Sequence, residues 1–598
     1  MIDQHARFLY YCNLKSGVQK VMVLGQPLRK TVHSLRRFLR RLLRAVNPLR
    51  FLGQGIFALR NRLRRRFPID YVWLTLQGML PPLPEKRNWF LRRFQGAPPI
   101  SLWELERAFR RLAADPRPQG IILNLRGVEM PLTDIHTLRE QIRTLRAAGK
   151  RVIAYAQNYD MRTYFLASAC DQILMQPGGE VATTGLRQQA IFLKDALAMI
   201  GVSFDVVAIS PYKGALDSLS RSEISPEGRE QLEWLLDARY EYLIREIAAG
   251  RRQSPEAMRM MIDSAPHTEI TAAQAGYIDG VLYEEALPDH LNARHLVPWK
   301  RAQRILLREP EKRPSTEKYV AVLPITGTMM PGESGSPPVD LPVPLPIVGD
   351  DRAGDLTIVQ QVRHLLDDED AAAVVLFIDS GGGAVITAEA ITSALTTLAE
   401  TRPVVACMNA VAGSGGYEVA MPAEWIVAQP ATITGSIGVV TAKIVTGGLR
   451  DRFGVQTVEF TRGANADLFS EGKPFTEEQR ALMRDQIEHF YRQFLEKVAQ
   501  SRRMSVEAVD AVGGGRVWTG EQALERGLID AIGGLKEAIA KARALASLPD
   551  DARTVLVETG GAWLPPKRRD ASAALVYALE NTRALTAGAQ VLMPFWIE

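Results

Sequence analysis

The chain repeats one pattern of residues at a spacing of about 250 positions, and this repeat constrains the fold more than any other feature. The stretch YFLASACDQILMQP (164–177) matches YEVAMPAEWIVAQP (417–430), and DYVWLTLQG (70–78) matches KYVAVLPITG (318–327). Solenoid repeats have periods of up to roughly 50 residues. The much longer spacing found here therefore indicates a duplicated domain.

Both halves alternate strand-like and helix-like segments. The apolar runs GIILNLRG (120–127) and AAVVLFIDSGGG (372–383) are typical of buried strands. Long helical patterns cover 225–249, where Ser225 is the expected N-cap before Pro226, and 475–499, which begins with a Thr-x-x-Gln capping box. Strands that alternate with helices predict the α/β class for each half.

A charged segment with two prolines, REPEKRPSTE (308–317), separates the halves and is predicted to be a linker. At 598 residues the chain is too long for a single hydrophobic core. We therefore predict five parts, which are a basic segment (1–67), a first repeat (68–307), the linker (308–317), a second repeat (318–549) and a C-terminal extension (550–598).

The basic segment carries a large share of the positive charge. Residues 1–66 contain sixteen Lys and Arg residues and one acid, so the remainder is net acidic although the whole chain has a formal charge of +6. In SLRRFLRRLLRAV (34–46), apolar residues recur at helical spacing and arginines fill the opposite face. Such a helix suits an anionic membrane surface, and we favour this over an RNA-binding arm or a solvated helix packed on the body. Neither a run of 18 apolar residues nor a cleavable signal peptide is visible, so the segment is expected to lie on a membrane rather than cross it.

Several common types of site have no support in the sequence. It contains no HExxH, Walker A or GxGxxG pattern, which are the signatures of metalloproteases, P-loop proteins and dinucleotide-binding domains. Cys12, Cys170 and Cys407 form neither a CxxC pair nor a disulfide framework. We expect no cofactor, no metal ion and no nucleic-acid partner.

Ser414 is the candidate nucleophile. It lies in Gly-Ser-Gly-Gly after the apolar run PVVACM (403–408), and glycines at a strand-to-helix corner would leave its hydroxyl exposed. Such a sequence is also common in flexible loops. A serine needs a base to become a strong nucleophile, and no histidine lies within forty residues on either side.

The two halves divide between them the residues that could perform chemistry. Where the second half has Ser414 the first has Met161, and where the first has Lys213 the second has a residue within two positions of Ala464. A lysine can act as a general base only when it is neutral, and burial among apolar groups lowers its pKa. Lys213 follows an apolar strand pattern and could face a dry interface between the halves, although most lysines are solvated.

Other parts of an acyl-transfer site can also be sought. Gly415 directly follows the serine at the start of a helix, where its N–H could stabilise an oxyanion. A second donor could come from Gly382 or Gly383 in the DSGGGA loop, although glycine runs more often serve tight turns. The hydroxyl of Ser436, in TGSIGVV (434–440), could orient the lysine amine or could belong to an ordinary turn.

On these residues the chain resembles the tandem form of the signal peptide peptidase A (protease IV) family of Ser/Lys peptidases. The resemblance spans roughly residues 68–548. It implies that Ser414 is the nucleophile, Lys213 the general base and Ser436 the residue that orients the lysine. The most specific matching stretches are NYDMRTYFLASACDQI, PYKGALD, AVAGSGGYEVAMPAEWIVAQPATITGSIGV and TGEQALERGLIDAIGG.

The same resemblance implies a fold and an assembly. Each half would adopt a crotonase-like, Clp-protease-like ββα superhelix, and the protomers would form a bowl-shaped homo-oligomer, with a tetramer suspected from the family. The oxyanion donors would be Gly382 or Gly383 together with Gly415.

The sequence departs from the family pattern at three places. Gly381 replaces a proline in the loop that would supply an oxyanion donor, which loosens that loop. Glu418 stands where a bulky apolar or aromatic residue is usual, which puts the expected preference for apolar substrate side chains in doubt. The basic amphipathic segment stands where the tandem members typically have a membrane-spanning helix.

We therefore predict a serine endopeptidase that cleaves unfolded or membrane-released peptides, such as cleaved signal peptides, and is peripherally attached to the cell membrane. Two alternatives stay open. One is a crotonase-type acyl-CoA enzyme, for which Glu418 is the one nearby acid. The other is a membrane-surface scaffold that keeps the fold without activity. The proline-rich stretch 339–349 would be a rim that guides substrate or a stiff loop, and the extension 550–598 has no assigned chemistry.

Overall fold

A computed structural model describes residues 58–85, 93, 98–308, 314–335 and 351–557, together with the backbone of 590–592. The chain divides into two compact units, Met1–Pro68 with Arg304–Glu311, and Ile69–Gln303 with Lys312–Glu598. In the first unit, the Asn61 side chain donates a hydrogen bond to the Arg308 carbonyl (2.7 Å). The predicted amphipathic helix (34–46), the stretch 339–349 and most of the extension 550–598 lie outside the described residues.

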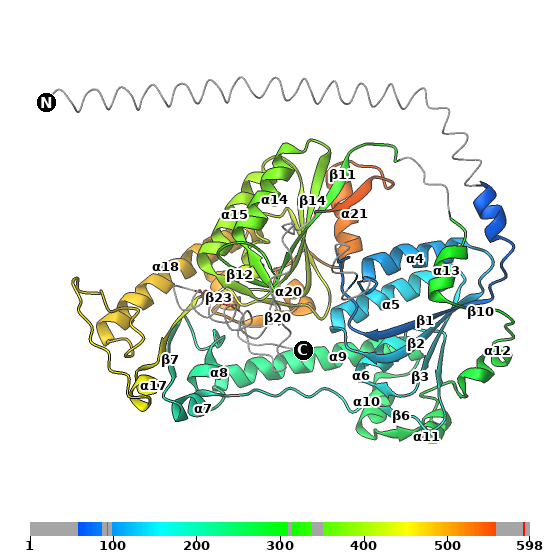
Figure 1. Ribbon diagram of the computed structural model, residues 1–598, viewed down its shortest axis with the longest axis horizontal. Helices are drawn as coiled ribbons and strands as arrows, with labels where there is room; N and C mark the ends of the chain where they lie inside the picture. The colour runs from blue at the N-terminus through cyan, green and yellow to red at the C-terminus, as the bar shows by residue number, and fades with distance from the viewer. Residues whose placement is uncertain are drawn as a thin grey trace. The chain divides into compact units, whose positions relative to one another are not determined.

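The second half of the chain folds around a parallel sheet in the second unit (Figure 1). The strands in the middle of this sheet are apolar and buried on both faces, and a parallel sheet of this kind needs helices on each face. Helices α14 (Asp355–Asp367) and α15 (Val385–Ala399) cover one face, and α21 (Leu535–Leu545) covers the other. The strand order is β22 (Arg553–Leu556), β11 (Tyr319–Thr326), β14 (Ala371–Ser380), β16 (Val404–Gly413), β17 (Trp425–Ala428) and β21 (Ala531–Ile532).

The first half repeats this order in a sheet of its own. Each of its strands has a counterpart at the same place in the second half, so the α/β class and the duplication predicted from the sequence are confirmed. The order is β10 (Leu296–Pro298), β1 (Tyr71–Gly78), β2 (Gly120–Val128), β3 (Arg151–Ala156), β5 (Gln172–Met175) and β9 (Gly280–Val281).

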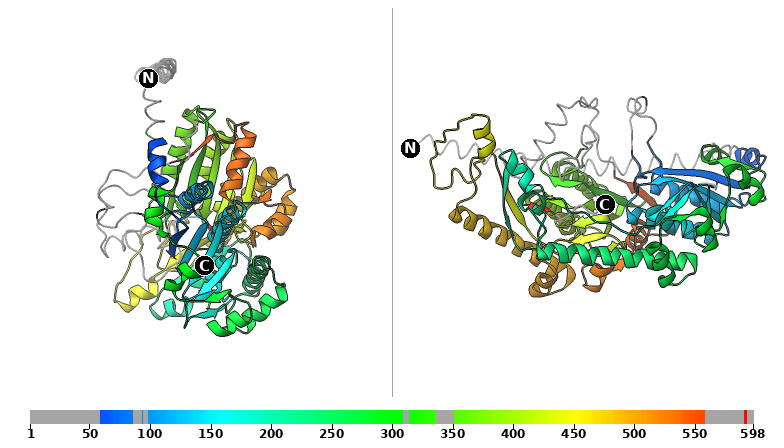
Figure 2. Two further views of the ribbon diagram at one scale, coloured as in Figure 1. Left: turned by 90° about the vertical axis from the view of Figure 1, so that its right-hand side faces the viewer. Right: turned by 90° about the horizontal axis from the view of Figure 1, so that it is seen from below.

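The two predicted long helices form with the predicted caps. Helix α9 (Pro226–Arg251) begins after Ser225, whose side chain accepts a hydrogen bond from the Gly228 N–H, and α18 (Glu477–Arg502) begins with a capping box at Thr476. Helix α9 also reaches the second half (Figure 2). There Trp234 stacks on Trp518 with ring centroids 5.0 Å apart. None of the described helices is both long and apolar enough to cross a membrane.

A third sheet joins the two halves. Strand β7 (Ser203–Ala208) of the first half pairs antiparallel with β19 (Val440–Val445) of the second. Between the short helices α7 (Lys194–Met199) and α17 (Gly447–Arg452), Gly201 approaches Gly448 so closely that a Cβ at Gly201 would lie 2.3 Å from the Gly448 backbone. The chain that follows β7, which includes Lys213, is thereby carried onto the second half.

Candidate active site

Ser414 occupies a sharp turn between β16 and the short helix α16 (Gly415–Glu418). Its φ of 55° and ψ of −119° are rarely adopted by residues with a side chain, and such strain is concentrated at functional sites. The turn is fixed by a hydrogen bond from the Ser414 N–H to the Gly435 carbonyl (2.8 Å). Gly416 has to lack a side chain because a Cβ would lie 2.1 Å from the Ser380 carbonyl oxygen.

Ser436 lies beside Ser414 because the strands that precede them are neighbours. Strand β18 (Ile433–Gly435) pairs parallel with β16, and Gly413 is opposite Gly435. The residue after each strand is therefore a serine at the same edge of the sheet. Ser436 also has a positive φ, of 52°, and both serines are completely buried.

Lys213 reaches this edge from the other half of the chain. Its Nζ lies 2.8 Å from the Ser414 Oγ, 2.9 Å from the Ser436 Oγ and 2.7 Å from the Ser436 carbonyl oxygen. The structure thus brings together the three residues for which the sequence suggested catalytic roles.

Burial controls the charge of the lysine. The Lys213 side chain is 1% exposed, and burial alone lowers its pKa well below the usual value of 10.5. The Ser436 carbonyl can only accept a hydrogen bond, so a neutral amine has to direct one N–H towards it. The lone pair of the amine can then accept a hydrogen bond from either the Ser414 or the Ser436 hydroxyl.

A glycine run that the sequence analysis did not single out forms one wall of the lysine site. A Cβ on Gly515 would lie 2.6 Å from both the N and the Cα of Lys213, and Gly515 has a φ of 91°. Its N–H donates to the Ile437 carbonyl (2.8 Å), and the Ser436 N–H donates to the Arg516 carbonyl (2.6 Å). The run Gly513–Gly515 therefore positions both Lys213 and Ser436, and the three consecutive glycines were the available signal.

Aromatic and cationic side chains pack the loop that carries Lys213 against the second half. The guanidinium of Arg516 lies 4.1 Å from the ring centroid of Tyr212, the neighbour of Lys213, and Tyr212 packs at 6.1 Å from Trp234. Trp234 in turn stacks on Trp518. Aromatic pairs contribute about 0.5–1.5 kcal/mol each beyond their buried area, so this stack stabilises the approach of the two halves.

The predicted oxyanion donors lie around the same turn. Gly382 and Gly383, with φ of 98° and 158°, form the start of β15 (Gly382–Ala384) after Ser380. The Ser380 hydroxyl donates to the Gly327 carbonyl (2.6 Å) and accepts from the Gly382 N–H (3.2 Å), which holds the loop although Gly381 stands in place of a proline. Within the described part of the chain, the Gly415 N–H donates no hydrogen bond.

Glu418 is buried, but its partner is Lys497 and not the Lys213 of the candidate site. Its carboxylate accepts a hydrogen bond from the Lys497 Nζ (2.7 Å), and Lys497 also bonds Glu389 of α15. Burial raises the pKa of Glu418, and the charge of Lys497 opposes that rise. The acid therefore belongs to an ion cluster between α15, α16 and α18.

Two carboxyl groups, those of Asp379 and Asp134, share a partner at the end of β14. Asn409 donates hydrogen bonds to Asp379 (2.8 Å) and to Asp134 (3.3 Å), which comes from helix α5 (Leu132–Ala147) of the first half. Burial, reinforced by the charge of Asp379, raises the pKa of Asp134 to about 7. This cluster adds another polar contact between the halves.

The edge of β15 is paired with an extended segment. Residues 590–592 form strand β23 (Gln590–Leu592), which runs antiparallel to β15 and also pairs with β19 at Val440. Strand β15 therefore presents backbone N–H and C=O groups to which an extended chain can bind. In the sequence, this strand begins directly after the loop that follows Ser380.

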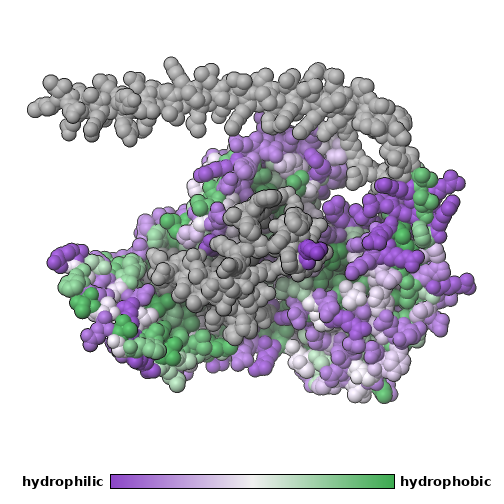
Figure 3. Space-filling view, in the orientation of Figure 1, coloured by the Kyte–Doolittle hydropathy of each residue, from purple (hydrophilic) through white to green (hydrophobic). Residues whose placement is uncertain are grey.

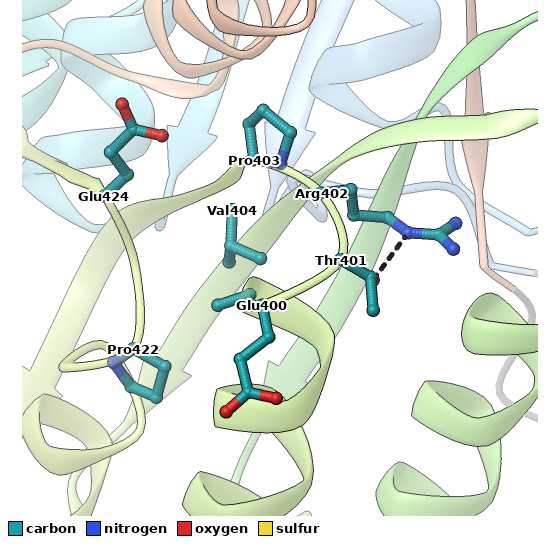
Figure 4. A pocket seen from close by; sticks show the side chains of 8 residues that line it. Glu400, Thr401, Arg402, Pro403, Val404, Pro422 and Glu424 are labelled. Carbon is teal, nitrogen blue, oxygen red and sulfur yellow. Dashed lines mark hydrogen bonds between the residues drawn. The ribbon is translucent and has the colours of Figure 1, made fainter.

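A pocket on the second half lies away from this site. It is lined by residues 399–404 together with Pro422 and Glu424 (Figure 4). These residues surround the start of β16, whereas Ser414 follows its end, and a strand rises about 3.3 Å per residue. The pocket is thus separated from Ser414 by the length of the strand.

Comparisons with known proteins place the chain in a family. The model of peptidase family S49 matches residues 144–295 and 396–549, one range in each half. Serine protease SPPA, chloroplastic, from Arabidopsis thaliana is 31% identical over 77% of this chain and 68% of that protein. Protease 4 from Salmonella typhi is 30% identical over 75% and 72%, and Protease 4 from Haemophilus influenzae 29% over 76% and 74%. The expected tandem of α/β domains is confirmed, and the chain belongs to the serine peptidases of peptidase family S49.

Proposed function

We propose that the chain is an endopeptidase whose nucleophile is Ser414 and whose general base is Lys213, with Ser436 orienting the lysine. The observation that carries the proposal is the 2.8 Å contact between the Ser414 hydroxyl and a completely buried amine. Burial lowers the pKa of the amine and so favours its neutral form, and a neutral amine beside a hydroxyl can accept its proton.

The proposed reaction has two stages. As the Ser414 Oγ forms a bond to the substrate carbonyl carbon, Lys213 takes the hydroxyl proton and an electron pair moves to the carbonyl oxygen. That oxyanion is stabilised by the N–H of Gly415 and by that of Gly382 or Gly383. The ammonium then gives its proton to the leaving amine as the C–N bond breaks, and a water activated by Lys213 hydrolyses the acyl-enzyme in the same manner.

Extended peptides are the substrates that the site supports best. The edge of β15 pairs antiparallel with residues 590–592 of the chain, and a substrate peptide could bind by the same backbone hydrogen bonds. Folded proteins do not present such a free strand, so we propose unfolded or membrane-released peptides, including cleaved signal peptides.

We also propose that residues 1–67 hold the enzyme on the surface of the cell membrane. The support is compositional, since sixteen Lys and Arg residues accompany one acid in residues 1–66. Such a segment is attracted to anionic lipid headgroups.

The test is hydrolysis of quenched fluorogenic peptides by the purified full chain. Ser414→Ala and Lys213→Met should each abolish turnover, and Ser436→Ala should reduce it. Ser547→Ala is the matched control, because Ser547 also has a positive φ, of 50°, but lies outside the site. Wild-type rates in both Ser414→Ala and Lys213→Met would refute the dyad. Tight binding of an acyl-CoA without peptide cleavage would indicate a crotonase-type enzyme, and the absence of both activities would indicate a scaffold.

A further inference from the structure

Strand β16 changes its neighbour part-way along its length, before it reaches the nucleophile. Residues 405–408 pair with β17, and residues 411–413 pair with β18, the strand that leads to Ser436. The change takes place in a bulge, because the single residue Asp379 of β14 faces the three residues 409–411 of β16. Bulges beside active sites re-aim the side chains that follow them. The shape of this bulge therefore decides where the strand delivers its serine.

The side chain of Asp379 supplies the acceptors that the bulge needs. Its carboxylate accepts hydrogen bonds from the Val411 N–H (3.1 Å) and from the Asn409 side-chain amide (2.8 Å). Burial raises the pKa of Asp379, and hydrogen bonds from Asn409 and from the N–H groups of Val411 and Ala410 oppose that rise. A backbone N–H that a bulge removes from the ladder has to find another acceptor, and here one carboxylate serves.

The same residue adjoins the loop of the predicted oxyanion donors. Ser380 directly follows Asp379, and its hydroxyl donates to the Gly327 carbonyl and accepts from the Gly382 N–H. Asp379 therefore lies where the strand that leads to Ser414 meets the loop that leads to Gly382.

The first half shows the same place without such a carboxylate. Helices α7 and α17 begin at residues 194 and 447, so equivalent positions are 253 residues apart, and Arg126 corresponds to Asp379. There β3 ends, and the chain that continues it, β4 (Tyr159–Asp160), pairs with β6 (Glu180–Ala182) in a separate sheet. On the same spacing Met161 stands in place of the nucleophile. The unbroken strand, the carboxylate in its bulge and the serine thus occur together in the second half.

The first half contacts the bulge through α5. The Asn409 amide donates to Asp134 of this helix as well (3.3 Å). Gln429 donates to the Asn409 side-chain oxygen (3.3 Å) and accepts from the Thr137 hydroxyl (3.3 Å), one turn further along α5. Hydrophilic residues cover much of the surface drawn in Figure 3, but Asn409 and Asp134 are each 3% exposed. Buried polar groups that are all paired hold their surroundings in one arrangement.

We propose that Asp379 is a positioning residue, whose carboxylate fixes the bulge of β16 and thereby places Ser414 against Lys213 and beside the oxyanion loop. The inference rests on the proposed roles of Ser414 and Lys213, although Asp379 itself takes no part in bond making or proton transfer. Without the carboxylate the Val411 N–H loses its acceptor, and the bulge relaxes three residues before the nucleophile.

Asp379→Asn tests this role, because it keeps the size of the side chain and replaces one acceptor by a donor. We expect kcat for a quenched fluorogenic peptide to fall by about 10- to 100-fold, since a misplacement of about 1 Å can cost about 100-fold. KM should stay near the wild-type value, because the edge of β15 to which a peptide would bind is unchanged. The rate at which a fluorophosphonate labels Ser414 should fall in parallel with kcat.

Asp368→Asn is the matched control at the other end of β14. Asp368 is also half-buried, and it accepts hydrogen bonds from the Tyr319 hydroxyl (2.8 Å) and from the Asp370 N–H (2.9 Å). Its substitution should lower thermal stability and keep the wild-type kcat. An equal loss of kcat in both variants, or no loss in Asp379→Asn, would overturn the proposal.

An exchange of the two side chains tests the contact itself. Asp379→Asn combined with Asn409→Asp reverses the donor and the acceptor of the 2.8 Å contact and leaves an amide oxygen for the Val411 N–H. This double variant should recover most of the kcat that Asp379→Asn loses. A folded double variant that is no more active than Asp379→Asn would overturn the pairing on which the proposal depends.

The pH profile separates positioning of the serine from docking of the halves. Lys213 keeps its burial in Asp379→Asn, so the rising limb of kcat/KM should stay at the wild-type pH. A limb that moves to higher pH would show that the variant hydrates the lysine, and would overturn the positioning role. A wild type that neither cleaves peptides nor is labelled at Ser414 would refute the proposed function and this inference with it. An active wild type with an equally active Asp379→Asn would overturn this inference alone.

Discussion

Replacement of Gly515 by alanine would test how closely the lysine has to be placed. The added Cβ would lie 2.6 Å from the Lys213 N and Cα, whereas ordinary contacts begin at 3.4 Å. One of the two backbones must therefore move by about 0.8 Å, the difference between these distances. The Gly515 N–H is also held by its hydrogen bond to the Ile437 carbonyl. Part of any movement therefore falls on the loop that carries Lys213.

The expected loss of activity follows from the geometry. If Lys213 takes up the movement, the 2.8 Å separation of its Nζ and the Ser414 Oγ approaches a length at which no hydrogen bond remains. A misplacement of about 1 Å can cost about 100-fold in rate. We therefore expect kcat/KM for peptides to fall by about two orders of magnitude, or about 2.7 kcal/mol of transition-state stabilisation.

The pH profile provides a second readout of the same change. A displaced amine is more hydrated, so the effect of burial weakens and the pKa of Lys213 rises towards 10.5. The rising limb of kcat/KM should therefore move to higher pH, and part of the lost activity should return in alkaline buffer.

Gly276→Ala is the control for backbone strain. Gly276 has a φ of 73° and no atom within 4 Å of an added Cβ, so its substitution has the conformational cost of about 1–2 kcal/mol without a clash. Gly515→Ala should lose at least as much thermal stability as Gly276→Ala, because it adds a clash to the same conformational cost, and only Gly515→Ala should lose activity. If Gly515→Ala matches Gly276→Ala in kcat/KM and in pH profile, then the close contact of Gly515 with the Lys213 backbone does not control the position of the lysine.

Three further predictions concern charge and the strand edge. Lys213→Met should lower kcat/KM by at least about 10²–10⁴-fold and raise the free energy of unfolding at neutral pH. Because the folded pKa of Lys213 lies below that of the unfolded chain, wild-type stability rises with pH up to about 10.5, so the gain measured by urea denaturation should shrink in alkaline buffer. Asp134 has a folded pKa raised from 3.8 to about 7, so wild-type stability should fall by up to about 1.4 kcal/mol per pH unit across that range. Asp134→Asn should flatten this fall, and an unchanged slope would contradict the assignment. Deletion of residues 590–598 should lower KM for peptides at constant kcat, since β23 occupies the edge of β15, and a higher KM would show that the segment helps to bind substrate.

Much of the fold could be predicted because its local signals agree with its tertiary structure. The apolar runs that predict strands at 120–127 and 372–383 form the central strands β2 and β14, which are buried on both faces. The capping residues before the long helices act locally and were identified correctly. The pairing of β7 with β19 was not predicted, because it joins residues more than two hundred positions apart and leaves no periodic signal.

The candidate site was predicted as a set of residues but not as a geometry. Ser414, Lys213 and Ser436 were identified from short motifs and from the comparison of the halves, and the structure brings all three together. Gly515 was missed because its role depends on the space beside the Lys213 backbone, and a sequence does not record such space. The partners of Glu418 were missed for a similar reason, since Lys497 and Glu389 come from other helices.

The division of the site between two halves links its activity to their docking. The pKa of Lys213 is lowered only because β7 delivers the lysine into the second half, where Ser436 and the Gly513–Gly515 run enclose it. A half on its own would hold either a solvated, protonated lysine or a serine without a base. Any change that loosens β7 from β19 should therefore raise the pKa of the lysine before it unfolds either sheet, so peptide cleavage at neutral pH should be lost at a lower denaturant concentration than secondary structure.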